Sequence, residues 1–96
     1  MDKEIVNIFK RVKDPETGEN ILNLGIVTGY TIKDKEIEIF MDFMSRENAC
    51  FFCKIVAWSL INKISEDLIE EFRKIGFEKI RLIDCINPNI EYKSFP

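Results

Sequence analysis

Two cysteines, Cys50 and Cys53, stand three positions apart in the stretch ENACFFCKIV. On a helix this spacing points both sulfurs the same way, so they could chelate one metal ion or form a redox couple. Two thiolates do not complete a four-coordinate iron or zinc site, but the same pair from a second copy of the chain would do so. The sequence contains no histidine, so any metal would be held mainly by Cys, Asp or Glu.

The cysteine pair lies where a strand-like segment gives way to a helical one. If Cys50 begins that helix, unpaired backbone N–H groups and the helix dipole lower the thiol pKa from about 8.5 into a range of roughly 3.5 to 7.5. Free cysteine is also among the most buried residue types, and two cysteines beside Phe51 and Phe52 could simply pack in a core. Both interpretations stay open on spacing alone. Cys85 is expected to be a core residue rather than a third ligand.

A thioredoxin-like disulfide couple is the third interpretation of the pair. That motif follows a strand in a larger βαβ frame and usually has proline or glycine between its cysteines. Here two phenylalanines occupy those positions. A thiol–disulfide oxidoreductase therefore remains an alternative that fits the sequence less well.

Asp14 and Glu16 form a second group of interest, in the stretch DPETGEN. The segment reads as a turn, in which Asp14 bonds nearby backbone amides and Pro15 and Gly18 interrupt regular structure. Two carboxylates on one loop could also bind a cation or position a partner. The turn interpretation is sufficient by itself.

The composition limits the class of protein. The chain has 96 residues, 46% of them apolar and 32% charged, which is typical of one globular domain. A net charge of −3 argues against broad binding to nucleic-acid backbones. Charges break every apolar run well short of a membrane span, and we see no signal peptide. We therefore expect a cytoplasmic protein with reduced thiols, no membrane association and no nucleic-acid partner.

Hydrophobic periodicity predicts the elements that position these residues. They are a helix over 3–13, strands over 21–32 and 37–44 with a hairpin turn at 33–35, helical stretches over 49–64 and 65–75 separated by a new N-cap at Ser65, and a strand over 77–86. The tail, 87–96, has two prolines and is expected to lack regular structure. The prediction is a single α+β domain over 1–96, of order α-β-β-α-β, with a three-stranded sheet and its helices on one face.

The first half of the chain resembles the SufT/PaaD-type family of metal–sulfur cluster maturation proteins. Members read V-x-D-P-E, then a short spacer and an apolar segment ending L-G-(L/I)-V. The matching residues here are Val12, Asp14-Pro15-Glu16, Ile21-Leu22 and Leu24-Gly25-Ile26-Val27. The resemblance covers about the first 44 residues and implies the same α-β-β-α-β fold. It also implies that the loop with Asp14 and Glu16 belongs to a functional surface.

The second half departs from that family, which carries paired threonines and a proline around one reactive cysteine. Cys50 is the best positional match. The stretch ACFFCKIVAWSL is similar instead to the cluster-binding segment of NifU C-terminal scaffold domains, which hold a [4Fe–4S] cluster between two chains through a CxxC pair. Together the resemblances imply a non-enzymatic factor in which Cys50 and Cys53 bind a labile cluster or iron, in a homodimer. Its partners would be apo iron–sulfur proteins and assembly factors. The alternative is an adaptor of the same pathway without a cluster.

Overall fold

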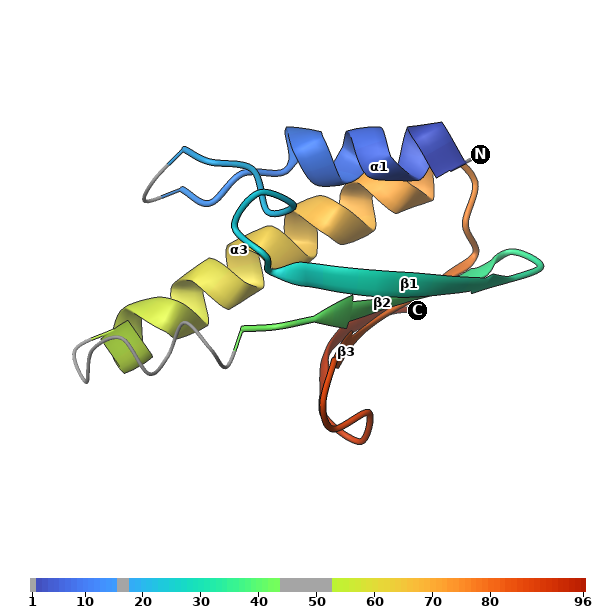
Figure 1. The fold of residues 1–96 in the computed structure, drawn as a ribbon. Coiled ribbons are helices and arrows are strands. Elements are labelled where there is room, and N and C mark those ends of the chain that lie inside the picture. The colour runs from blue at the N-terminus through green and yellow to red at the C-terminus, as the bar shows by residue number, and fades with distance from the viewer. Residues whose placement is uncertain (1, 16–17, 44–52) are drawn as a thin grey trace.

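The computed structural model describes residues 2–15, 18–43 and 53–96. Along the chain the elements are helix α1 (Asp2–Arg11), strands β1 (Val27–Lys33) and β2 (Glu36–Met41), helix α3 (Cys53–Lys74), and strands β3 (Lys79–Asp84) and β4 (Glu91–Phe95). Figure 1 shows both helices on one side of the sheet. The described chain is therefore a two-layer α+β domain, as expected.

The sheet has four strands in the order β1-β2-β3-β4, so the prediction of three strands is wrong. β1 pairs antiparallel with β2, β2 pairs parallel with β3, and β3 pairs antiparallel with β4. The missed strand, β4, lies in the tail that was expected to be irregular. Pro88 lies in the loop before β4 and Pro96 follows its last residue, so neither proline removes a hydrogen bond from the strand interior.

α3 runs unbroken for 22 residues, so the predicted break at Ser65 is wrong. Ser65 is fully buried and lies within a continuous apolar stripe. The stripe consists of Ile61, Ile64, Leu68, Ile69 and Phe72. Serine and the acids after it can cap a helix, but packing of this stripe decides the local structure instead.

The hairpin between β1 and β2 confirms the predicted turn. Lys33 pairs with Glu36, and Asp34 between them has a φ of 55°, a conformation that aspartate tolerates better than most residues. β1 begins later than expected, because residues 21–25 form a turn that ends at Gly25, whose φ is 73°. Glycine is favoured there because it has no Cβ to clash.

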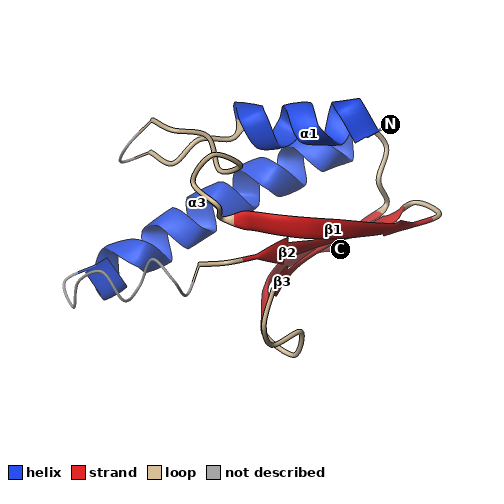
Figure 2. Cartoon of the chain, viewed as in Figure 1, coloured by secondary structure: helices blue, strands red, loops and turns tan. Residues whose placement is uncertain are grey.

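One face of the sheet packs against the helices and the other does not. Figure 2 shows the strand layer and the helix layer as two separate layers. Side chains that alternate along β2 and β3 are buried beneath the helices. They are Ile37, Ile39, Met41, Ile80 and Leu82. The other face carries Glu38, Phe40, Arg81 and Ile83, and we call it the open face. No described helix has both the length and the apolar character needed to cross a bilayer.

Candidate functional site

α3 begins at the second cysteine of the pair. Its first residue is Cys53, whose side chain is not described, and Cys50 lies outside the described residues. The first backbone N–H groups of an α-helix have no partner within the helix, and its dipole is positive at that end. The start of α3 is therefore an environment that favours thiolate over thiol.

The edge of the sheet at which β2 and β3 end is the described surface that leads into the cysteine segment. Because the two strands are parallel, their carboxyl ends meet, with Met41 opposite Asp84. The backbone N–H of Cys85 donates to the carbonyl of Met41 at 2.9 Å. Cys85 itself is a free, half-buried thiol. The chain leaves this edge through Asp42 and Phe43 toward Cys50 and Cys53.

Asp84 is the principal polar group of this edge, and it is only 3% exposed. Its Oδ2 accepts hydrogen bonds from the backbone N–H groups of Ile86 and Asn87, at 3.0 and 2.9 Å. Its Oδ1 accepts one from the Tyr92 hydroxyl at 2.7 Å. Burial by itself raises the pKa of Asp84, but these three donors outweigh it and hold the pKa below its ordinary value. Through these bonds the carboxylate braces the loop that follows.

Tyr92 connects this brace to the chain that leaves β2. Its ring meets the Phe43 ring edge-on, with centroids 4.9 Å apart and an interplanar angle of 82°. Phe43 is the last described residue before Cys53. Aromatic pairs in this geometry add to the stability that area burial gives. The contact holds the chain just after β2 against β4.

The loop after α1 adopts the predicted turn. The backbone N–H of Asp14 donates to the carbonyl of Glu19 at 2.9 Å, and that of Gly18 donates to the carbonyl of Asp14 at 2.8 Å. Lys13 and Asn20 form an isolated antiparallel bridge at its base. The Asp14 side chain is almost fully buried, and Glu16 lies outside the described residues. A role of either carboxylate in function stays a prediction.

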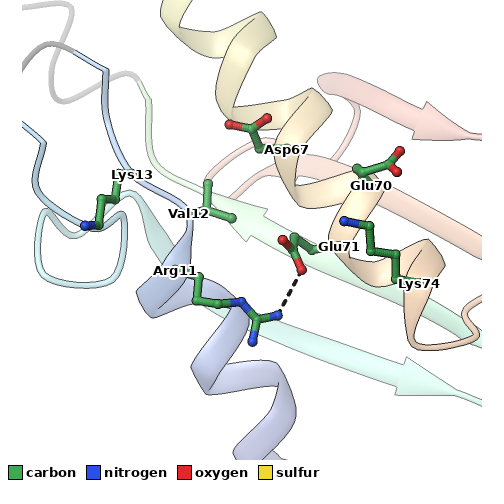
Figure 3. A pocket seen from close by; sticks show the side chains of 7 residues that line it. All are labelled: Arg11, Val12, Lys13, Asp67, Glu70, Glu71 and Lys74. Atoms are coloured by element: carbon green, nitrogen blue, oxygen red, sulfur yellow. Dashed lines mark hydrogen bonds and ion pairs between the residues drawn. The ribbon is translucent and has the colours of Figure 1, made fainter.

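A charged pocket of about 340 Å³ lies between the end of α1 and α3, close to this loop. Figure 3 shows the Arg11 guanidinium directed at Glu71 across the gap between the helices, at a distance of 2.9 Å. The other charged residues of its lining are Lys13, Asp67, Glu70 and Lys74. Acids and bases balance in this lining, so the pocket favours neither a simple anion nor a simple cation.

Asp84 and Tyr92 were not identified from the sequence. The run DCINPN has the Asp, Asn and Pro content of a turn, and that signal points to Asp84. Tyr92 gave no such signal, because its bond to Asp84 depends on β4. Among the residues that the structure describes, no three Cys, Asp or Glu side chains gather as a metal site would require. No family model, curated protein or solved structure matches the chain in comparisons with known proteins.

Proposed function

We propose that this chain is a non-enzymatic iron–sulfur cluster assembly or transfer factor. Cys50 and Cys53 bind a labile cluster or iron, shared between two copies of the chain, and deliver it to apo-proteins in the cytoplasm. One observation carries the proposal: α3, a helix of 22 residues, begins at Cys53. A helix start stabilises thiolates, and thiolates are the ligands that iron–sulfur clusters use.

Two further features support the proposal. The first 44 or so residues resemble the SufT/PaaD-type family, whose D-P-E element corresponds to the loop of Asp14 and Glu16. The parallel strands β2 and β3 end at one edge, and the cysteine segment follows directly from it. We assign Asp14 and Glu16 the organisation of the neighbouring loop rather than iron binding. The cluster is cargo, so loose binding suits its release.

Anaerobic reconstitution with iron and sulfide tests the proposal. We expect wild type to acquire bound iron, acid-labile sulfide and visible charge-transfer absorbance. Cys50→Ala and Cys53→Ala should lose most of all three signals. Cys85→Ala is the matched control, because Cys85 is a half-buried thiol outside the pair, and it should load like wild type. Wild type that binds no iron, or three variants that load equally, would contradict cluster binding by the pair.

A second candidate is an adaptor that docks proteins of the same pathway without holding a cluster. The exposed side chain of Ile86, in the loop that Asp84 braces, favours it. Under this function the double substitution of Cys50 and Cys53 by serine leaves partner binding intact. A thiol–disulfide oxidoreductase would instead form a reversible disulfide between the pair, which thiol titration after equilibration in glutathione buffers detects.

A further inference from the structure

The loop between β3 and β4, residues 85–90, exposes two isoleucines to solvent. Ile86 is 81% exposed and Ile90 is 40% exposed. Single exposed apolar residues are common on protein surfaces, so exposure alone means little. Two further properties, the order of this loop and the charge around it, distinguish it. We call residues 85–90 the Asp84 loop.

The Asp84 loop is held in one conformation by a buried carboxylate and by its own backbone. Asp84 accepts two amide hydrogen bonds from the loop and donates its own N–H to the carbonyl of Ile90 at 2.9 Å. Within the loop, the side-chain Oδ1 of Asn87 accepts a hydrogen bond from the N–H of Asn89 at 3.1 Å. The backbone carbonyl of Asn87 accepts one from the N–H of Ile90 at 3.0 Å. A loop that is ordered before binding loses little conformational entropy when a partner covers it.

The Asp84 loop projects away from α1 and α3, as the orange-red hairpin in Figure 1 shows. It continues from the part of the open face where Phe40 and Ile83 pair across β2 and β3. Phe40 is half-buried. An apolar side chain on an ordered loop, next to a partly apolar sheet face, has the form of an anchor that fills a pocket on another protein.

The charges beside the Asp84 loop are mainly acidic. On the open face Arg81 binds Glu38 at 3.0 Å and Glu91 at 3.3 Å, so one guanidinium serves two carboxylates. Asp42, which follows β2, adds one more carboxylate at the same end of the sheet. The partner that complements this surface carries basic residues around an apolar socket, whereas an anionic membrane would be repelled.

We infer that the Asp84 loop docks a protein partner, with Ile86 as the apolar anchor and the carboxylates around it selecting a basic rim. The inference does not depend on cluster binding, because every residue that carries it belongs to the described sheet and loop. It can therefore be tested on the protein without iron.

The test is an NMR titration of the isotope-labelled full chain with a synthetic amphipathic peptide of leucine and lysine. A peptide with glutamate in place of lysine keeps the apolar pattern and reverses the charge. We expect saturable shifts in the amides of residues 84–91 and in those of Phe40 and Ile83 with the lysine peptide, and none with the glutamate peptide. Ile86→Ser should weaken binding about tenfold.

Ile75→Ser is the matched control. Ile75 is 39% exposed and follows the last residue of α3, away from the Asp84 loop, so its substitution should leave the affinity unchanged. Shifts that avoid the loop, equal binding of the two peptides, or equal losses in the two variants would overturn the inference. Cosedimentation of wild type, but not Ile86→Ser, with anionic phosphatidylglycerol vesicles would also overturn it, because the loop would then bind a membrane. The amide spectrum of each variant shows that it remains folded.

Discussion

The side chains on the two faces of the sheet have different roles. We call the face beneath the helices the covered face, in contrast to the open face. Beneath the helices, Ile39 and Leu82 are fully buried and belong to one apolar core. On the open face, Ile83 lies outside that core although its neighbours bury it, and Arg81 forms ion pairs across three strands. Stability therefore depends mainly on the covered face, whereas the open face and its loop present the groups that a partner can recognise.

The largest expected effect compares two adjacent residues of β3. Leu82→Ala should lower the free energy of unfolding by about 2–5 kcal/mol, because the helices and the sheet cannot close the cavity. Ile83→Ala should cost less, because side chains on the open face can move into the space. Urea denaturation followed by circular dichroism measures both. An equal or larger loss for Ile83→Ala would show that the two faces are packed alike.

Asp84→Ala is expected to lower the free energy of unfolding by about 1–3 kcal/mol, because it leaves two amides and the Tyr92 hydroxyl without their acceptor. The pKa of Asp84 is lower in the folded state than its ordinary value. The charge of Asp84 therefore contributes fully to stability at pH values above the ordinary carboxyl pKa. This contribution is lost as the pH falls through the lower folded-state value. The difference in the free energy of unfolding between wild type and Asp84→Ala should therefore narrow below about pH 4.

Urea denaturation at several pH values measures that gap. Glu70→Ala removes an exposed carboxylate on α3 and serves as the control, with an expected change within about 0.5 kcal/mol. A gap for Asp84→Ala that stays constant to low pH would mean that the charge of Asp84 does not stabilise the loop.

Ser65→Ala should raise the free energy of unfolding by about 1 kcal/mol. The Ser65 hydroxyl, on α3, is buried and has no hydrogen-bond partner among the described residues. Alanine removes this unsatisfied group and is also the better helix former. Thermal denaturation measures the change. A lower melting temperature would show that the hydroxyl has a partner, such as a buried water molecule.

The smallest effect is expected on the open face. Arg81→Gln breaks the ion pairs with Glu38 and Glu91, whose side chains are more than a third exposed. Exposed ion pairs contribute little, so the free energy of unfolding should fall by less than about 1 kcal/mol. The difference from wild type should shrink further in concentrated salt. A loss as large as that of Leu82→Ala would contradict the distinction between the faces.

Local patterns were enough to predict much of the fold. The alternation of Ile37, Ile39 and Met41 identified β2 and its covered face, and helical spacing identified α1. The errors lie where tertiary contacts decide. Ser65 has the local chemistry of a helix cap, but the apolar stripe around it continues α3. β4 was missed because prolines flank it and because its order depends on pairing with β3.

The candidate site was predictable only in part. The sequence placed Cys50 at the start of the helix and Cys53 one turn later, whereas α3 begins at Cys53 and Cys50 lies outside the described residues. The bond between Asp84 and Tyr92 joins residues eight positions apart across a hairpin, so it could not be found before β4 was known. The exposure of Ile86 likewise has no signature in its residue type, since isoleucine is usually buried.

Alkylation of the cysteines as a function of pH tests most directly whether the chain presents a reactive thiol pair at the start of α3. Iodoacetamide labelling of the reduced native protein, with peptide mapping, gives a rate for each cysteine, and Cys85 serves as the internal reference. We predict that Cys50, Cys53 or both react with an apparent pKa well below the ordinary cysteine value of about 8.5. Cysteines at 50 and 53 that react only after denaturation would contradict the account.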